Sequence, residues 1–302
     1  MAAHASLRAL RAFVEVARRG GVAPAARRLG VSPSAVSHLL RELEAGLGVA
    51  LFRRDPGRGA ALTEAGARLR AGIGDAFDGI ERAVAELGRH GAEVRVSTLS
   101  TFATLWLVPR LPRLQAAVPG LRVLVATETR PVDLAAEPFD CAIRWGRGGW
   151  PGLEETPLLR EVLVAVAGPS LLAGRPAPRT AAELLRLPRI AARSRPEDWL
   201  LLLAALPDGA AAAAAAPDPA LVFQTRALAV RAAVAGLGVA VVDEALVGDA
   251  LRDGHLVRAS PVAVPRPEAH VFVARREALL RDPHLRRFRD WLAAEATATE
   301  GG

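Results

Sequence analysis

The feature that most constrains the fold is a pair of short helical patterns that meet at Gly30. Residues 24–29 predict a first helix that ends at this glycine, and residues 33–45 predict a second one. Ser32 stands at the favoured N-cap position of the second helix, and Pro33 occupies its first helical position. Two helices joined in this way form a helix-turn-helix, a unit whose second helix enters the major groove of DNA.

The second predicted helix has two different faces. Its apolar stripe consists of Val36, Leu39, Leu40 and Leu43. The opposite face carries side chains of a kind that contact base edges and phosphates. Residues 51–62, with a Gly/Arg-rich turn at 55–59, predict a β-wing that leads into a long helix. The candidate DNA contacts are therefore Arg27, Pro33, Ser34, Ser37, His38, Arg41, Arg53, Arg54 and Arg58.

The positive charge of the chain is concentrated in this N-terminal region. Residues 1–60 carry ten arginines and four acidic residues, a net charge of +6, whereas the whole chain carries +7. Such a local excess is typical of a module that binds phosphates. Arginines that merely keep a small domain in solution are the alternative, but solubility gives no reason for the asymmetry.

The spacing of residues 7–66 resembles the DNA-binding head of LysR-type transcriptional regulators. The shared patterns are AA-x-x-LG-V-S-x-SAVS, LE-x-x-LG-V-x-LF-x-R and LTEAG. Farther along, WLVPRLP, VDLAAEPFDCAIRWGRGGWPGLE, RPEDW and ALAVRAAVAGLGVAVV resemble the branch that contains the glycine-cleavage activator and the AmpR β-lactamase regulators. One departure is Ala23, where relatives usually place serine or threonine. We expect that phosphate contact to be missing or to come from a backbone amide or Arg27.

Residues 62–88 predict one long helix. Its apolar side chains recur every three or four residues, at Leu69, Ile73, Phe77, Ile80, Val84 and Leu87. In LysR-type proteins a linker helix at this place pairs with its counterpart in a second chain, so these six residues are the candidate dimer contacts. The alternative is an amphipathic helix that packs on its own domain. Residues 88–91 predict a hinge.

From residue 92 onward, strand patterns alternate with helical ones. Strands are predicted at 94–99, 121–127, 141–145, 162–167, 189–192, 221–223, 239–242 and 271–274. Helices are predicted from about 100 to 117 with an interruption at Pro109, and at 132–136, 180–187, 197–206, 227–235, 244–252 and 283–296. The alanine tract at 210–216 is expected to be a loop insertion. Repeated βα units imply mainly parallel sheets with right-handed crossovers.

The predicted fold class is therefore α/β overall, with an N-terminal winged helix-turn-helix and a linker helix. The resemblance implies a C-terminal effector domain of two α/β lobes, similar to periplasmic binding proteins. The expected domains are 1–62, 63–90 and 91–302. Within the last, the first lobe would cover about 92–162 and 268–296, and the second about 163–267.

The cleft between two such lobes is the natural ligand site. Ligands of open α/β sheets bind beyond the carboxyl ends of strands and near helix N-termini. By analogy with the family, the candidate effector contacts are Ser100, Thr101, Phe102, Glu128, Thr129, Trp145, Ser194, Thr225 and Asp243. Two facing helix starts, at Ser100–Thr101 and at Thr225, favour an anionic effector. The alternative for each serine or threonine is simple helix capping.

Other classes of site are weakly supported. The chain has no lysine for a Walker A loop, and its six histidines are scattered, so no metal or other cofactor is expected. Cys141 is the only cysteine, which excludes an internal disulfide. Its predicted strand favours a small core residue, with a redox role left open. The N-terminus does not read as a signal peptide, so we expect a cytoplasmic protein of a GC-rich bacterium.

These observations together predict a ligand-responsive DNA-binding regulator without enzymatic activity. As the resemblance implies, it would bind imperfect palindromes as a dimer of dimers. Its partners would be double-stranded DNA, a small effector and further copies of itself, with RNA polymerase as a further candidate and no membrane. The alternatives are an enzyme or transport-type binding protein that uses the α/β part, and a DNA-binding repressor or architectural protein that ignores ligands. No nucleophile–base constellation supports an enzyme.

Overall fold

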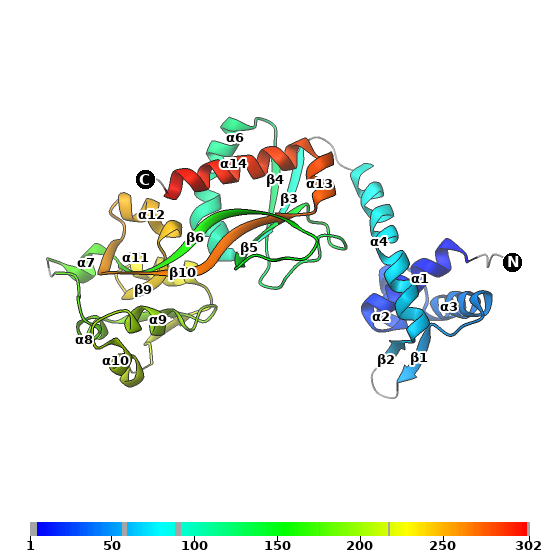
Figure 1. Ribbon diagram of the computed structural model, residues 1–302, viewed down its shortest axis with the longest axis horizontal. Coiled ribbons are helices and arrows are strands. Elements are labelled where there is room, and N and C mark those ends of the chain that lie inside the picture. The colour runs from blue at the N-terminus through cyan, green and yellow to red at the C-terminus, as the bar shows by residue number, and fades with distance from the viewer. Residues whose placement is uncertain (1–4, 56–58, 88–91, 175, 217, 301–302) are drawn as a thin grey trace. The chain divides into compact units, whose positions relative to one another are not determined.

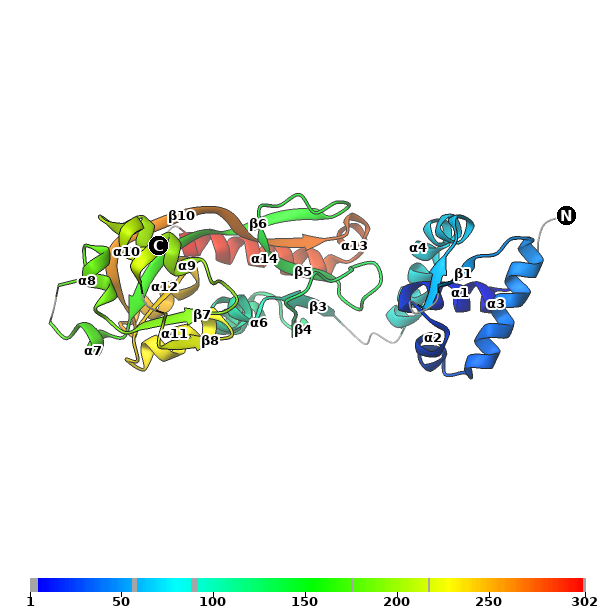
Figure 2. The same ribbon diagram turned by 90° about the horizontal axis from the view of Figure 1, so that it is seen from below.

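The computed structural model describes residues 5–55, 59–87, 92–174, 176–216 and 218–300 (Figures 1 and 2). The chain divides into two compact units, Met1–Arg89 and His90–Gly302. The first unit is mainly helical. Its elements are α1 (Leu7–Arg19), α2 (Val22–Leu29), α3 (Pro33–Leu47), β1 (Phe52–Asp55), β2 (Gly59–Leu62) and α4 (Glu64–Leu87).

The turn between α2 and α3 follows from a few local residues. Gly30 ends α2 with φ of 67°, a left-handed conformation that glycine adopts without steric cost. The Oγ of Ser32 then accepts a hydrogen bond from the N–H of Ala35 at 3.2 Å and caps α3. The predicted helix-turn-helix is thus confirmed, with α2 beginning two residues earlier and α3 ending two residues later than expected. Ala23 consequently lies inside α2, and Gly21 takes the N-cap position.

The predicted wing is an antiparallel hairpin of β1 and β2. Glu44 of α3 fixes its start, because its Oε1 accepts hydrogen bonds from the N–H groups of Leu51 at 2.7 Å and Phe52 at 3.1 Å. Thr63 begins α4 in a similar way, since its Oγ1 accepts from the N–H of Gly66 at 3.1 Å. A Cβ at Gly66 would lie 2.2 Å from the carbonyl oxygen of Leu51. The LTEAG sequence therefore joins the wing to α4 through a contact that only glycine allows.

The second unit is built on one eight-stranded sheet with the order β4-β3-β5-β10-β6-β9-β7-β8. Its strands are β3 (Glu93–Thr98), β4 (Arg122–Thr127), β5 (Cys141–Gly146), β6 (Glu154–Ala167), β7 (Arg189–Ala192), β8 (Leu221–Phe223), β9 (Val239–Asp243) and β10 (Val257–Ala274). Its helices are α5 (Ser100–Phe102), the π-helical turn η1 (Ala103–Leu107), α6 (Val108–Ala117), α7 (Pro169–Leu172), α8 (Ala181–Leu185), α9 (Asp198–Ala204), α10 (Gly209–Ala215), α11 (Arg226–Val234), α12 (Glu244–Arg252), α13 (Arg276–Arg281) and α14 (Pro283–Glu300).

Two long strands, β6 and β10, run antiparallel through the middle of the sheet and connect the lobes (Figure 2). The outer strands pair in parallel, β4-β3-β5 in the first lobe and β9-β7-β8 in the second. The prediction of parallel sheets is correct there and wrong for the middle, where all pairings are antiparallel. The expected lobe boundaries, at 162/163 and 267/268, fall inside β6 and β10.

Apolar cores lie on both faces of the sheet. In the first lobe, α6 and α14 cover one face, with Trp106, Phe272 and Phe288 fully buried beneath them (Figure 1). A smaller core around Leu134 and Val273 lies on the opposite face, where connecting segments rather than helices cover it. In the second lobe, α8 and α9 pack on one side and α11 and α12 on the other.

Three helix predictions need correction. The expected helix at 132–136 is a single turn, because Asp133 uses its side chain to accept from the N–H of Ala135 and Pro138 prevents continuation. The alanine tract expected as a loop forms α10, which the high helix propensity of alanine and packing against the α8–α9 core explain. At Pro109 the chain stays helical, and the irregularity is the π-helical turn η1 just before it.

Candidate functional site

The polar face of α3 is open to solvent, as the amphipathic pattern predicts. The side chains that pack inward are Val36, Leu40 and Leu43. On the other face Ser37 is half-buried, and the exposed side chains are Ser34, His38 and Arg41. Nδ1 of His38 lies 3.7 Å from Oε1 of Glu42, with both side chains at least 60% exposed. These groups therefore have few fixed contacts within the chain and can turn toward a ligand.

The other predicted DNA contacts surround this helix within the first unit. Arg27 of α2 and Pro33 at the start of α3 are exposed, and so is Arg53 of β1. Arg54 follows in the same strand, and Arg58 lies in a segment that the structure does not describe. The unit thus places exposed cationic side chains on α2, α3 and the wing.

Helix α4 divides its apolar stripe between two roles. Leu69, Ile73 and Phe77 pack against the core of their own unit. Ile80, next along the stripe, is 51% exposed. The side chains of Val84 and Leu87 and the predicted hinge at 88–91 lie outside the described part of the chain. The first half of the stripe therefore supports packing of the helix on its own unit. The exposed Ile80 supports the other interpretation, in which the stripe contacts a second chain.

The predicted effector residues lie where strands end in the two lobes. Ser100 and Thr101 open α5 directly after β3, and both are half-buried. Thr225 is the N-cap of α11, where its Oγ1 accepts a hydrogen bond from the N–H of Leu228 at 3.4 Å. Both helix starts therefore exist, and Thr225 performs the capping role.

The remaining members of that set differ in exposure. Phe102 is fully buried in the first-lobe core. Glu128 is half-buried and Thr129 exposed after β4, and Ser194 is exposed after β7. Asp243 is fully buried at the N-cap of α12. Phe102 and Asp243 would meet a ligand only if their surroundings moved.

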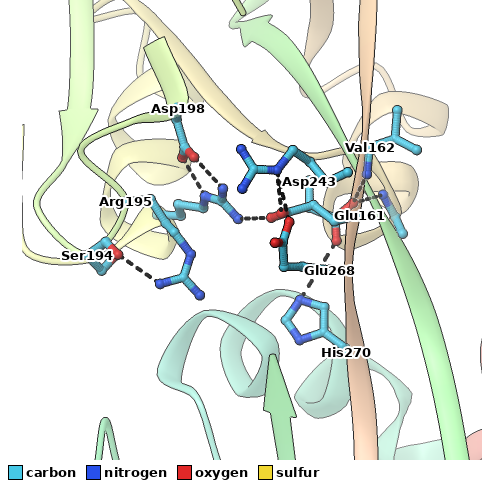
Figure 3. A network of polar contacts seen from close by, with 11 residues as sticks. Glu161, Val162, Ser194, Arg195, Asp198, Asp243, Glu268 and His270 are labelled. Carbon is cyan, nitrogen blue, oxygen red and sulfur yellow. Dashed lines mark hydrogen bonds and ion pairs between the residues drawn. The ribbon is translucent and has the colours of Figure 1, made fainter. Parts of the chain in front are cut away.

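A buried arginine of the second unit contacts two acidic side chains from other elements, Asp198 and Glu161, which are labelled in Figure 3. Arg226, the first residue of α11, donates two hydrogen bonds to the carboxylate of Asp198, at 2.6 and 2.5 Å. A third, at 2.6 Å, goes to Oε1 of Glu161 in β6. All three side chains are no more than 5% exposed. Burial raises the pKa of Asp198, and its bonds to Arg226 oppose that rise.

Beside this group, Asp243 and His270 keep polar atoms without a hydrogen-bond partner among the described residues. Oδ1 of Asp243 accepts from the N–H groups of Val162 and Ala245, at 3.2 and 3.3 Å. Its Oδ2 lies 3.7 Å from Nε2 of His270, which is longer than a hydrogen bond (Figure 3). The His270 ring packs on Phe102, with 5.0 Å between ring centroids.

Both side chains favour their neutral forms. Burial raises the pKa of Asp243 to about 7, and the nearby charge of Glu161 adds to the rise. Burial lowers the pKa of His270 to about 3, and the charges of Arg226 and Arg195 act in the same direction. Their contact is therefore not an ion pair between two charged groups.

A cavity of about 240 Å³ opens over the loop-covered face of the first lobe. Its polar groups are Arg144 and Trp145 of β5, Thr129, and Arg195, which follows β7 in the second lobe. The Arg195 guanidinium lies over the Trp145 ring, 3.8 Å from the ring centroid. The apolar lining consists of Leu99, Pro131, Val132, Leu134, Ala142, Trp150, Leu153 and Val273.

Comparison with known proteins identifies both units. Residues 7–67 match the family model described as a bacterial regulatory helix-turn-helix protein of the lysR family, and residues 88–297 match the LysR substrate binding domain. The chain belongs to the LysR family of transcriptional regulators. Members of this family bind DNA and small-molecule effectors and form oligomers.

Relatives match nearly the whole length of the chain. It is 37% identical to the HTH-type transcriptional regulator TrpI of Pseudomonas aeruginosa, over 95% of this chain and 96% of the relative. It is 33% identical to the glycine cleavage system transcriptional activator of Escherichia coli K12, over 97% and 95%. The second unit resembles the solved effector domain of AmpR from Pseudomonas aeruginosa, with a TM-score of 0.54, 27% identity, and coverage of 69% of this chain and 96% of that domain. The resemblance to the LysR type, its branch and its regulatory rather than enzymatic character are thereby confirmed.

Two further features bear on the sequence expectations. Cys141 is fully buried at the start of β5, and burial raises the pKa of its thiol, as a small core residue would show. Within the residues described, no group of three or more histidine, cysteine or acidic side chains is placed to hold a metal ion. No helix of that part of the chain has both the length and the apolar character to cross a lipid bilayer.

Sequence reasoning missed the two arginines of the cavity and the buried group around Arg226. Of the nine predicted effector contacts, only Thr129 and Trp145 line the cavity. Arg195 and Asp198 lie in the RPEDW sequence, and Arg226 directly follows the predicted Thr225. These arginines thus lie in or next to sequences that the prediction already used. They could not be singled out, because arginine is frequent in this chain and these positions follow no distinctive pattern.

Proposed function

We propose that this LysR-family protein reads DNA with the exposed face of α3 and changes its DNA binding when an effector occupies the second unit. The observation that carries the proposal is the two-faced α3, whose buried stripe fixes the orientation of Ser37, His38 and Arg41. The domain division at 1–62, 63–90 and 91–302 is part of this proposal. So is action in the bacterial cytoplasm, where the chromosomal DNA lies.

The effector is proposed to contact Ser100, Thr101 and Thr225 at the ends of β3 and before α11. Supporting this placement, strands of both lobes end near helix starts that carry hydroxyl side chains, where the positive ends of the helix dipoles lie. The positive ends of these two helix dipoles favour an anionic effector. Closure of the lobes around it would shift the population between two arrangements of the dimer and so alter the bending of DNA.

His38→Ala should relax sequence preference, and Arg53→Ala should not. Loss of a base-reading side chain is expected to remove about 1–3 kcal/mol of discrimination at one position of the site. Arg53→Ala should weaken all sequences alike and reduce the salt dependence by about one unit of slope. Binding titrations on a promoter fragment and its single-base variants, at several salt concentrations, measure both effects.

Arg231→Ala is the matched control, because it removes one exposed arginine from α11 of the second unit. It should change neither sequence preference nor the salt slope. If His38→Ala and Arg53→Ala behave like this control, α3 and the wing do not form the DNA-binding surface.

Ile80→Glu should separate the protein into monomers. The exposed Ile80 continues the α4 stripe beyond the residues that pack on the first unit. We therefore expect Ile80 to be buried against the same helix of a second chain. A carboxylate buried in that seam is destabilising by several kcal/mol. Light scattering should show the lower mass, and DNA affinity should fall because two half-sites are no longer held together.

Ile80→Leu, which keeps an apolar side chain, should stay oligomeric. Ile73→Glu is not a clean test, because Ile73 packs on its own unit and the substitution would also disturb the DNA head. An Ile80→Glu protein with unchanged mass would place the dimer interface elsewhere.

A further inference from the structure

A buried contact at the junction of the two lobes contains several polar atoms without a partner. Oδ2 of Asp243, Oε2 of Glu161 and both ring nitrogens of His270 make no hydrogen bond among the described residues. These three side chains are at most 3% exposed. Buried polar groups in folded proteins are nearly always hydrogen-bonded. The unpartnered atoms therefore need an explanation, and one is a second arrangement of the lobes in which some of them pair.

Two of these residues lie on either side of the point where the chain passes between the lobes. Asp243 is the last residue of β9, which pairs with β6 in the second lobe. His270 belongs to the part of β10 that pairs with β5 in the first lobe. Between these two parts, from Pro265 to Ala269, the register of β10 against β6 shifts. A strand bends where its ladder is interrupted, so the lobes can turn about this point.

Each member of the contact is fixed to a different lobe. Oδ1 of Asp243 accepts from the N–H groups of Val162 and Ala245, so its carboxyl group moves with the end of β9 and the start of α12. The His270 ring packs on Phe102, which lies in the first-lobe core. The distance of 3.7 Å between Oδ2 and Nε2 therefore changes when the lobes turn relative to each other (Figure 3).

Burial and three neighbouring charges set the protonation of the pair. Burial raises the pKa of Asp243 to about 7, an effect that the charge of Glu161 supports and that of Arg226 opposes. Burial lowers the pKa of His270, and the charges of Arg226 and Arg195 act in the same direction. The imidazole is therefore neutral near pH 7, and it can donate one hydrogen bond without taking up a second proton.

The other acidic groups around the contact have arginine partners. In β6, β10, α9 and α12 these pairs are Glu161–Arg226, Glu268–Arg266, Asp198–Arg226 and Glu244–Arg258. Helix α5, whose Phe102 packs on His270, carries no charged residue. Asp243 differs from these acidic groups, because no arginine of the described part of the chain pairs with it and its Oδ2 has no donor.

We propose that the contact between Asp243 and His270 is a proton switch that makes the arrangement of the two lobes depend on pH. In the present arrangement Asp243 is protonated and Oδ2 needs no donor. Once the proton leaves to solvent, a buried carboxylate without a second donor is destabilising. Nε2–H of the neutral His270 supplies that donor if the lobes turn enough to shorten the 3.7 Å contact to a hydrogen bond of about 2.9 Å.

The direction of the response follows from the arrangement that holds the proton more tightly. The present arrangement keeps it on Asp243 up to a pKa of about 7, whereas the new hydrogen bond would stabilise the carboxylate and lower that pKa. Low pH therefore favours the present arrangement. Because one proton is released, the ratio of the second arrangement to the first should rise by up to about tenfold per pH unit and level off above about pH 7. This inference goes beyond the proposed function, because the signal is a proton and not a bound molecule.

Distances between two spin labels on the full-length protein measure the arrangement of the lobes directly. Thr127→Cys at the end of β4 and Arg193→Cys after β7 place the labels at exposed positions of the two lobes, in a Cys141→Ala background. Labelled chains are diluted with unlabelled ones, so that distances within one chain dominate. Between pH 5 and 7 the ratio of two distance populations should change by about 10- to 100-fold, with little further change at pH 8.

Asp243→Asn is the decisive variant and Asp253→Asn its control. Asparagine can still accept from the two backbone N–H groups that Asp243 binds, but it does not titrate, so the labels should keep the low-pH distribution at every pH. Asp253 is exposed at the other end of α12, and its variant should respond like the unmodified protein. His270→Phe keeps a ring beside Phe102 but removes the donor, so it should also lose the response.

Two results would overturn the switch. One is a label distribution that does not change with pH in the unmodified sequence, and the other is a full response in Asp243→Asn or His270→Phe. Infrared difference spectra give a second measurement: a carboxylic-acid C=O band that is absent from Asp243→Asn should disappear over the pH range in which the labels move.

DNA binding tests the proposed function separately. The difference in DNA affinity between the unmodified protein and Asp243→Asn should depend on pH, and titration of His38 in the DNA head is common to both proteins. If the labels respond to pH while this difference stays constant, the switch is supported, and the proposed effect of the lobe arrangement on DNA binding is refuted.

Discussion

Arg226→Met is expected to lower the free energy of unfolding of the second unit by about 3–5 kcal/mol. Arg226 makes three hydrogen bonds to Asp198 and Glu161, and none of these side chains has appreciable contact with water. Methionine of similar length would fill the space but leave two buried carboxylates without a cation. Urea denaturation followed by circular dichroism measures the loss.

Neutralising the carboxylates should restore much of that stability. In a triple variant, Arg226→Met with Asp198→Asn and Glu161→Gln, none of these three positions carries a charge. A buried ion pair exchanged for neutral groups of similar volume is often neutral or stabilising. The triple variant should therefore be more stable than the single one, which separates a charge effect from a packing effect.

The single variant should also depend on pH. Burial already raises the pKa of Asp198, and loss of Arg226 removes the interaction that opposes the rise. In the folded variant, Asp198 would therefore hold its proton at pH values where the unfolded chain, with an ordinary aspartate pKa of about 3.9, has lost it. The stability difference between the variant and the unmodified protein should therefore shrink as the pH falls from 8 to 5. Arg231→Met, on the exposed side of α11, should change stability by no more than about 0.5 kcal/mol. An Arg226→Met protein as stable as this control would show that the buried group contributes nothing.

The DNA head could be predicted from the sequence because its determinants are local. The Ser32 cap, the Gly30 turn and the stripe from Val36 to Leu43 all lie within a few residues of the structure that they specify. Helix caps and amphipathic stripes depend on neighbours three or four positions away. Within the helix-turn-helix, the errors are two residues at the start of α2 and two at the end of α3, where helix boundaries are least certain.

The centre of the second unit could not be predicted in the same way. β10 contains Pro261, Pro265 and Pro267, and prolines indicate against a central strand because they cannot donate to the ladder. The structure accommodates them where the register against β6 shifts, between Arg258 and Ala263 and between Pro265 and Ala269. Such bulges are visible only once the partner strand is known.

The buried polar contacts of the second unit could not be predicted from the sequence for a related reason. Glu161, Asp198 and Arg226 come from three elements that are far apart in the sequence, and their contact depends on the whole sheet. The predicted effector residues were chosen at strand ends and helix starts, whereas the cavity is lined by Arg144 and Arg195, whose hydrogen-bond acceptors are neutral groups. An unpaired charge is a property of the folded surroundings and not of any sequence pattern.

His270 and Asp243 should make opposite contributions to the pH dependence of stability. The folded chain keeps a proton on Asp243, whose pKa is about 7, at pH values where the unfolded chain has lost it. Stability from this group is therefore present at low pH and falls as the pH rises from about 4 to 7. His270, with a pKa of about 3, stays neutral in the fold while the unfolded chain takes up a proton below about 6.5. Its contribution is present at high pH and falls as the pH drops.

Between about pH 4 and 6.5 the two effects nearly cancel in the unmodified protein, and single variants should reveal them. The stability difference between the unmodified protein and His270→Gln should rise with pH over that window, by up to about 1.4 kcal/mol per unit. The difference from Asp243→Asn should fall by a similar amount. The groups facing the pair, Glu161, Arg226 and Arg195, are common to all these proteins, so their own titration largely drops out of the differences.

Denaturation curves at several pH values, with the double variant as control, test this directly. The double variant lacks both groups, so the stability difference between it and the unmodified protein, in which the two effects nearly cancel, should change little with pH over this window. If the two residues instead form a charged pair in the fold, the pKa of His270 would be raised and that of Asp243 lowered, and both slopes would reverse sign. Both side chains are buried, Nε2 of His270 lies 3.7 Å from Oδ2 of Asp243, and the His270 ring packs on Phe102, so the fold favours the neutral pair.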